Sequence, residues 1–285
     1  MSAISIISRL TFREAIRRRI MLAGLVLGVA FVIIYSIGTH FIFTQIAADT
    51  IANLPSQAAA NIMSAESTNT FLMMGLYAAT FLSVAMAALL GADTLAGEIN
   101  SGTIQTIATK PIRRADVVLG KWLGFAELLG LYVLLLAGGI FLSVFIQTGY
   151  SPQNMLIGLG LVYMESILIM TITLMLSAAF PALATGGIVF GLYGLAFIGG
   201  WIEEFGAVLQ NDTAIKVGII TSLLNPSESL WKRAAFEMQT PLMGTFFGSP
   251  FASLSVPSPL MMAYTFLYLI VVLVIAVRIF QTRDL

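Results

Sequence analysis

The stretch Gly97–Lys121, GEINSGTIQTIATKPIRRADVVLGK, separates two long apolar segments of the chain. It holds two acidic residues, four basic residues and one proline, whereas the segments on either side carry almost no charge. Polar connectors between long apolar segments are typical of membrane helices that are joined outside the bilayer. This stretch therefore predicts a helical membrane protein, and it raises the question of what so polar a connector binds.

The composition agrees with a membrane protein. The 285 residues are 58% hydrophobic and 10% charged, whereas a soluble domain carries about 25% charged residues. The formal net charge is zero, so the sequence has no signature of nucleic-acid binding. The absence of cysteine excludes disulfides, thiolate metal sites and cysteine nucleophiles.

Six apolar segments are long enough to cross a bilayer, which takes about 20 residues as a helix. They are Ile20–Phe43, Phe71–Ala92, Leu123–Ile146, Met155–Phe180, Leu183–Ile202 and Leu260–Val277. The first follows five arginines but is too long for a signal peptide and lacks a clear cleavage site, so we expect it to remain as an anchor. We predict an all-α integral membrane protein with a single transmembrane domain over residues 1–285.

Basic residues predict the orientation of the chain. With six spans, residues 1–19, the connector 93–122 and the C-terminal end share one side, and they hold eleven of the fourteen lysines and arginines. Only Lys216, Lys232 and Arg233 lie on the other side. The positive-inside rule therefore places both termini in the cytoplasm and residues 203–259 outside it.

The N-terminal 19 residues favour an interfacial helix. Arg9, Arg13 and Arg17 form one stripe at a spacing of four, and Phe12, Ile16 and Ile20 form an adjacent stripe. The helix either lies on the lipid headgroups, with its arginines on anionic lipid or a partner, or is a charged flank that only orients the first span.

The outer segment 203–259 predicts a short amphipathic helix. Asn225 suits an N-cap, Pro226 the first helical position and Glu228 a capping box. The face made by Leu230, Ala234 and Met238 is apolar. The pairs Glu228–Lys232 and Arg233–Glu237 have the spacing of helical ion pairs. We expect an extracytoplasmic helix, too short and too charged to cross the membrane.

No motif for chemistry emerges from the sequence. No lysine closes a phosphate-binding loop of the GxxxxGK[ST] type, so the chain has no ATP site of that kind. His40 is the only histidine, and its place near an outer boundary favours an interfacial residue over a catalytic or metal-binding one. We assign no catalytic, metal-binding or cofactor-binding residue.

Two acidic residues lie inside predicted spans, where charges are costly and usually face protein or a cavity. Glu127 is about 9 Å along a helix from Lys121, which is compatible with a place near the headgroups. Glu165 lies near the middle of its span. It either forms a hydrogen bond between helices or contributes to a translocation path.

The polar connector itself has two interpretations. Gly102 and Pro111 bracket the segment TIQTIATK, in which Ile104, Ile107 and Ala108 share one helical face. A short helix would rest that face on the span ends and turn polar side chains toward the cytoplasm. The alternative is a solvated loop without defined order.

The sequence around the connector resembles a known family. Glu98, Gly102-Thr103, Pro111, Arg113-Arg114 and Gly120-Lys121 resemble the E…GT…P..R…GK signature of permease subunits of ATP-binding-cassette transporters, of the ABC-2 exporter class. The opening FREAIRRRI and the layout of the spans also resemble these permeases, which include the permease for nitrous-oxide reductase maturation. The resemblance covers nearly the whole chain.

The resemblance implies a permease dimer, homomeric or heteromeric, in which each half binds a separate ATPase subunit that holds ATP and Mg. It places the coupling helix around Gly102–Lys110, and it implies that the outer helix caps an exit or receives an extracytoplasmic protein. The coupling residues would be Glu98, Gly102, Thr103, Ile104, Gln105, Thr106, Ile107, Lys110, Pro111, Arg113 and Arg114. The outer residues would be Leu230, Trp231, Ala234 and Met238.

Two functions remain open from the sequence. The chain is either the permease of an ATP-driven exporter in the cell membrane or a scaffold that transmits ATPase movement to an extracytoplasmic partner without transport. A continuous cavity at the dimer seam would favour the exporter. An intramembrane enzyme is disfavoured because no catalytic constellation is present. Membrane lipid is the expected surroundings of either, and nucleic acid is not an expected partner.

Overall fold

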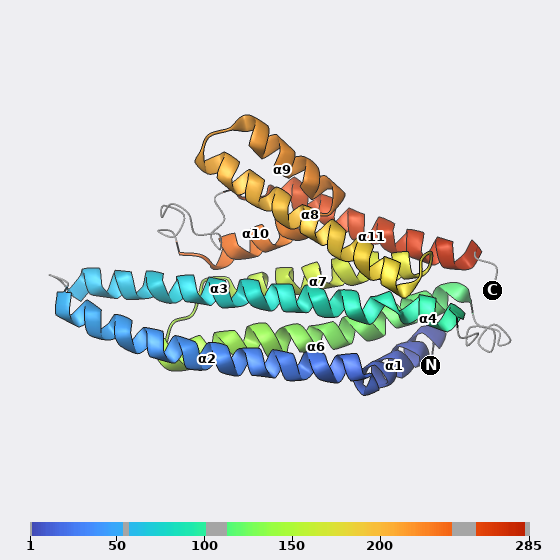
Figure 1. The fold of residues 1–285 in the computed structure, drawn as a ribbon, viewed down its shortest axis with the longest axis horizontal. Helices are drawn as coiled ribbons and strands as arrows, with labels where there is room; N and C mark the ends of the chain where they lie inside the picture. Colours follow the sequence, from blue (N-terminus) through green and yellow to red (C-terminus); the bar gives the residue numbers. More distant parts are fainter. Residues whose placement is uncertain (1, 54–56, 101–112, 241–254, 283–285) are drawn as a thin grey trace.

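The computed structural model describes residues 2–53, 57–100, 113–240 and 255–282. This part of the chain is almost entirely helical and contains no strand. The longest helices run roughly along the long axis of the molecule (Figure 1). The chain is an all-α integral membrane protein, as predicted. The helices are α1 (Ala3–Arg17), α2 (Arg19–Asn53), α3 (Gln57–Ala92), α4 (Thr94–Asn100), α6 (Arg114–Thr148), α7 (Met155–Ser177), α8 (Ala182–Val208), α9 (Asp212–Leu224), α10 (Ser227–Met238) and α11 (Pro259–Thr282).

Six helices among the described residues have the length and composition of membrane spans, which agrees with the six predicted segments. The spans are Arg19–Gln45, Ile62–Gly97, Arg114–Thr148, Met155–Ser177, Ala182–Val208 and Pro259–Thr282. The second and third start before Phe71 and Leu123, the residues where the apolar segments begin. The difference arises because hydropathy locates the apolar part of a helix, whereas the hydrogen-bonded backbone continues into polar residues.

α7 forms the centre of the bundle. Its residues 165–174 are all buried, and it packs against α3, α6, α8, α10 and α11. A helix that is enclosed on most sides needs no amphipathic pattern, which explains why the apolar residues of α7 are not confined to one face. α2 lies at the edge of the bundle, and much of its apolar surface is exposed.

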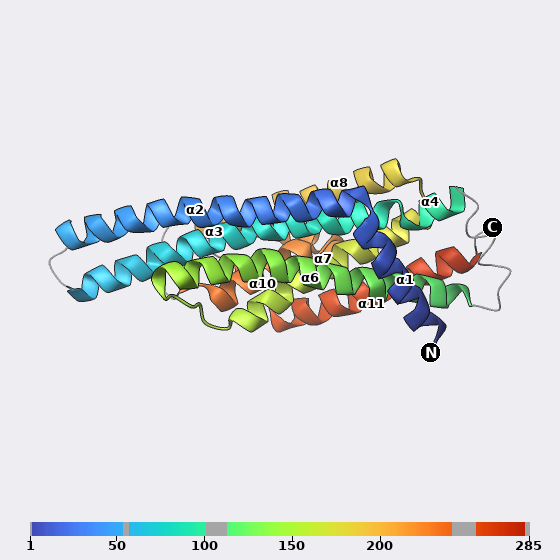
Figure 2. The same ribbon diagram turned by 90° about the horizontal axis from the view of Figure 1, so that it is seen from below.

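The N-terminal helix α1 packs obliquely across α6, as Figure 2 shows. Two glycines of α6 make this contact close: a Cβ at Gly124 would lie 2.6 Å from the Ser8 carbonyl oxygen, and Gly120 faces Ile7 in the same way. The buried face of α1 consists of Ser8, Thr11 and Ala15. It is not the predicted stripe of Phe12, Ile16 and Ile20, because so close an approach requires small side chains. The arginines at positions 9, 13 and 17 are exposed.

The predicted outer segment folds back onto the spans. α8 continues to Val208, and α9 returns along it. The two helices approach so closely that a Cβ at Gly218 would lie 2.7 Å from the Gly199 carbonyl oxygen. Such contact between backbones is possible only where one helix lacks a side chain.

The turn between α9 and α10 contacts α8 and α11, and its residue Asn225 is buried. Asn225 Nδ2 donates to the carbonyl oxygen of Leu192, in the first half of α8. The hydroxyl of Tyr268, in α11, donates to the Leu224 carbonyl oxygen at 2.9 Å. The α9–α10 pair therefore contacts both α8 and α11. The extracytoplasmic location of residues 203–259 stays a prediction.

Candidate functional site

Glu165 is the least exposed acidic side chain among those whose burial the structure describes. It lies halfway along α7, its side chain is fully buried, and neither carboxyl oxygen has a hydrogen-bond partner among the described residues. Burying such a group without a partner is costly. Its complete burial agrees with the expectation that Glu165 faces the inside of the protein and not lipid. No hydrogen bond from a neighbouring helix reaches its carboxyl oxygens in the described ranges, so an interhelical bond does not explain it.

A buried ion pair lies on the side of α10 that faces α8. Lys232 Nζ is 3.0 Å from Glu203 Oε2 and 3.9 Å from Glu204 Oε2. Lys232 and Glu203 are 5% and 8% exposed. Glu203 also accepts a hydrogen bond from the Ser255 hydroxyl. Three segments distant in sequence thus meet at one pair of charges.

The ion pairs of α10 differ from the sequence prediction. Arg233 pairs with Glu237, as predicted. Lys232 pairs across to α8 instead of within its own helix to Glu228, because α10 is buried and its lysine faces the acidic end of α8. Glu228 is buried too, and its side chain lies against Gly200.

Aromatic rings cover the space around these charges. The rings of Tyr77 in α3 and Trp231 in α10 are 4.9 Å apart. Tyr77 also stacks on Phe197 of α8, and Phe197 in turn contacts Trp201. We call Glu165, Glu203, Glu228 and Lys232, with these rings, the polar centre. It joins α3, α7, α8 and α10 in the interior of a membrane bundle.

The four residues expected to meet an outer partner lie inside the protein. Leu230, Trp231, Ala234 and Met238 are at most 3% exposed. Met238 rests on Gly158 of α7, and its carbonyl oxygen accepts a hydrogen bond from Asn69 of α3. They pack α10 onto the spans, so they offer no docking surface for another protein. The sequence did not show this burial, because an amphipathic helix has the same pattern whether its polar face meets water or buried charges; a role of these residues in closing an exit stays a prediction.

α10 begins one residue later than predicted. Its first helical residue is Ser227, and Pro226 stands at the cap position. Asn225 still provides a hydrogen-bond acceptor at the start of the helix, because its side-chain oxygen accepts a hydrogen bond from the Ser227 backbone N–H.

The connector Gly102–Pro111 lies outside the described residues, so its predicted helix stays a prediction. Both of its flanks are described. Glu98 belongs to α4, and Arg113 precedes the first residue of α6. Arg114 donates to the Gln281 carbonyl oxygen at 3.0 Å, which ties the start of α6 to the end of α11. α1, α4 and the ends of α6 and α11 gather at one end of the bundle (Figure 1).

Glu127 is separate from the polar centre. It is exposed, on the part of α6 that α1 crosses, and it accepts a hydrogen bond of 3.4 Å from the Ser8 hydroxyl. Its expected place near the headgroups stays a prediction. Glu127 and Glu165 therefore belong to two different sites.

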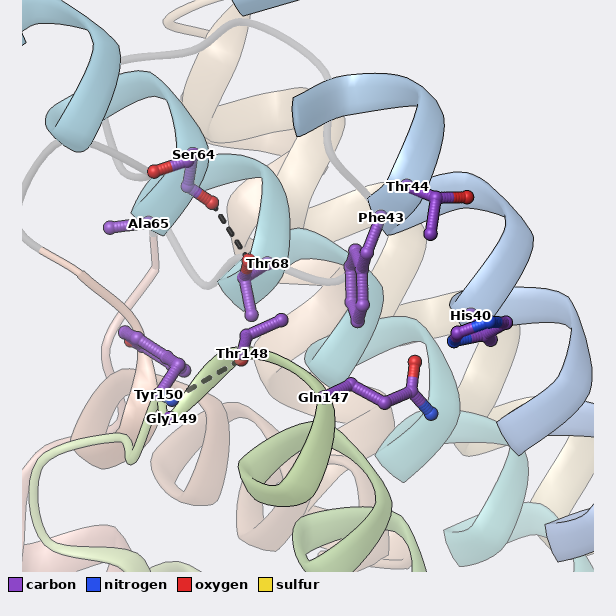
Figure 3. A pocket seen from close by; sticks show the side chains of 10 residues that line it. All are labelled: His40, Phe43, Thr44, Ser64, Ala65, Thr68, Gln147, Thr148, Gly149 and Tyr150. Atoms are coloured by element: carbon purple, nitrogen blue, oxygen red, sulfur yellow. Dashed lines mark hydrogen bonds between the residues drawn. The ribbon is translucent and has the colours of Figure 1, made fainter. Parts of the chain in front are cut away.

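A pocket of about 460 Å³ opens at the other end of the bundle, between α2, α3 and α6 (Figure 3). His40 lines it, together with Phe43, Thr68, Gln147 and Tyr150. The Gln147 amide donates to Ser36 and Ser143. The described residues include no group of three or more histidine, cysteine or acidic side chains that could hold a metal ion. The other described residues that line this pocket carry no acidic or basic side chain.

The chain matches one protein family over almost all of its length. Residues 5–285 match the family described as ABC-2 family transporter protein. No curated protein sequence matches the chain. The match spans all six membrane helices, the polar centre and the connector.

Proposed function

This chain belongs to the ABC-2 family of transporter proteins, and we propose that it is the permease subunit of an ATP-driven exporter. Proteins of this family are membrane components that work with an ABC ATPase and do not themselves catalyse a reaction. The family match over residues 5–285 is the observation that carries the proposal. Two ATPase subunits, each with bound ATP and Mg, would drive two permease copies in the cell membrane.

The connector between α4 and α6 is the proposed contact with the ATPase. The family signature falls on Glu98, Gly102-Thr103, Pro111 and Arg113-Arg114. The helix after the connector is well anchored, because α1 packs on α6 and Arg114 binds the end of α11. A push on the connector would therefore move α6 together with α1 and α11.

Hydrogen bonds offer a route from α6 to the polar centre. The Trp122 indole N–H of α6 donates to the Thr171 hydroxyl of α7 at 2.8 Å. The Tyr163 hydroxyl of α7 donates to the Ala126 carbonyl oxygen of α6 at 3.0 Å. α7 in turn carries Glu165 and packs on α10. We infer that ATP-driven movement of α6 is passed through α7 to α10, whose ion pair with α8 would open or hold the path.

The second permease copy has a suitable surface on α8. A Cβ added at Gly187, Gly191 or Gly194 would meet nothing within 4 Å. Stripes of small residues let membrane helices approach closely. This surface is therefore our candidate for the contact between the two copies.

The scaffold alternative loses its main support. That hypothesis placed the docking site on the outer helix Pro226–Met238, in which Leu230, Trp231, Ala234 and Met238 are buried. The charges of the polar centre favour a route for a substrate or for the movement that releases it. The termini would face the cytoplasm, on the evidence of the basic residues.

Affinity purification of the tagged chain from its native membrane tests the proposal. We expect a second polypeptide with a phosphate-binding loop to co-purify, and the complex in liposomes to hydrolyse ATP. A catalytically dead ATPase variant is the control for contaminating activity. A permease that purifies alone, with no ATPase able to restore hydrolysis, would contradict the proposal.

A further inference from the structure

A hollow of about 350 Å³ lies between α1 and α6, apart from the polar centre and from the connector. Its lining combines a basic side chain, an acidic side chain, three serine hydroxyls and three apolar side chains. The residues are Ser2, Ile4, Ser5, Ser8, Arg9, Phe12, Leu123 and Glu127. Its volume is within the usual range for small-molecule pockets, about 300–1,000 Å³.

The two charges of this hollow face the same space without pairing to each other. No ion pair within 4.0 Å joins Arg9 to Glu127. Among the described residues, the only hydrogen bond at either charged group is the 3.4 Å contact from the Ser8 hydroxyl to Glu127. Both side chains are exposed. A positive and a negative group are therefore held apart by a space that a ligand could fill.

The hollow lies on two helices, α1 and α6, that both expose apolar side chains. α1 crosses α6 near the end of the bundle (Figure 2). Leu123, which lines the hollow, is 39% exposed, and Ile6 and Leu10 elsewhere on α1 are 48% and 60% exposed. Apolar side chains so exposed on a membrane protein contact acyl chains, whereas the arginines of α1 stay at the polar boundary.

We propose that this hollow binds the headgroup of a phospholipid that carries both a phosphate and a primary ammonium group, as phosphoethanolamine does. The Arg9 guanidinium and the serine hydroxyls would hold the phosphate, for which arginine has a matching fork of donors. The Glu127 carboxylate would accept hydrogen bonds from the ammonium group. Ile4, Phe12 and Leu123 would contact the glycerol and the first methylene groups.

The pairing of charges makes the site selective. A choline headgroup has no N–H to donate to Glu127. A headgroup with only a phosphate leaves the carboxylate without a cation and places two negative groups close together. A lipid held here would stabilise the contact between α1 and α6. This inference depends on α1 lying at the membrane boundary and not on the transported substrate or the ATPase.

Native mass spectrometry of the delipidated full-length chain tests the proposal. Three lipids with identical acyl chains are titrated: phosphatidylethanolamine, phosphatidylcholine and phosphatidylglycerol. We expect the ethanolamine lipid to bind about tenfold more tightly than the other two, since a hydrogen bond to a charged group contributes about 1.5 kcal/mol or more. Equal binding of all three lipids would overturn the proposal.

Variants identify the site. Glu127→Gln should abolish the preference for ethanolamine over choline, and Glu127→Lys should shift the preference to phosphatidylglycerol. Arg9→Gln should weaken the binding of phosphatidylethanolamine about tenfold. Arg13→Gln, on the same exposed stripe but outside the hollow, should leave it unchanged. A loss with Arg13→Gln as large as with Arg9→Gln, or a Glu127→Lys variant that keeps the ethanolamine preference, would refute the assignment.

Soluble glycerophosphoethanolamine separates the two sources of this chemistry. If it competes at the concentration of the lipid, the ligand is the free headgroup. If only the lipid binds, the membrane supplies it. Failure of both to bind would overturn the site while leaving the proposed transport function standing.

Discussion

Replacing Lys232 with methionine tests whether the ion pair between α8 and α10 holds α10 in its buried position. Lys232 Nζ lies 3.0 Å from Glu203 Oε2, and both residues are almost completely buried. Methionine keeps most of the volume of the side chain but removes its charge. Glu203, Glu204 and Glu228 then stay close together without a cation.

The expected loss is large, because removing one partner of a buried pair costs about 3–5 kcal/mol. That is a change of more than a hundredfold in the folding equilibrium, at about 1.4 kcal/mol for each factor of ten. Lys232→Arg should lower the free energy of unfolding much less, since arginine keeps the positive charge. Adding Glu203→Gln to Lys232→Met should restore at least about 1 kcal/mol, because it removes a stranded carboxylate.

Reversible unfolding in mixed detergent micelles measures the free energy of unfolding of each variant. Lys216→Met is the matched control, since Lys216 is exposed on α9 and surface changes usually stay within about 0.5 kcal/mol. The reasoning is refuted if Lys232→Met unfolds within 1 kcal/mol of the parent protein, or if Glu203→Gln adds a further full loss to it.

Three other predictions address the helix packing, the buried acid and the topology. Gly218→Ala should destabilise the fold by about 1–3 kcal/mol, because the new Cβ meets the Gly199 carbonyl oxygen. Gly160→Ala should not destabilise the fold, because its new Cβ meets no atom within 4 Å. Equal free energies of unfolding for the two variants would contradict the close contact between α8 and α9. Glu165→Leu should leave the free energy of unfolding unchanged or higher, because no hydrogen bond among the described residues is lost. ATP hydrolysis by the reconstituted complex should fall at least about tenfold with Glu165→Leu and less with Glu165→Gln. Full hydrolysis by the leucine variant would leave Glu165 with a packing role only. A cysteine at Ser2, in a chain that has none, should react with a membrane-impermeant maleimide only after the cells are opened, and labelling of intact cells would reverse the proposed topology.

The sequence predicts the spans well because a bilayer imposes one simple requirement on them, a long apolar helix. The same requirement explains why the helix ends were misplaced, since α3 and α6 extend into polar residues that hydropathy does not count. Glu165 could be found because a charge in an apolar segment is conspicuous. That its carboxyl oxygens have no hydrogen-bond partner among the described residues could not be predicted, because this depends on which side chains of α3, α8 and α10 surround it.

The α9–α10 pair was harder to predict. Residues 227–238 have the pattern of a surface helix, with charges at helical spacing. Glu203 and Glu204, about 30 residues earlier in the chain, supply the counter-charge that Lys232 needs when it is buried. Gly199, Gly206 and Gly218 were the available signal, since glycines on facing helices indicate close packing. The partner of a buried charge, however, is fixed by tertiary structure alone.

The most direct test of the proposed function is binding of the ATPase by an Ile107→Asp variant. Ile107 is on the apolar face predicted for the connector, and losing a central interface contact costs about 2 kcal/mol or more, roughly a factor of thirty in affinity. Arg113→Ala, at an exposed position beside the connector, should cost less than about 1 kcal/mol. We predict that the ATPase co-purifies with the parent and with Arg113→Ala but is lost with Ile107→Asp. Retention of the ATPase and full ATP turnover by Ile107→Asp would contradict the proposal that this connector couples the two subunits.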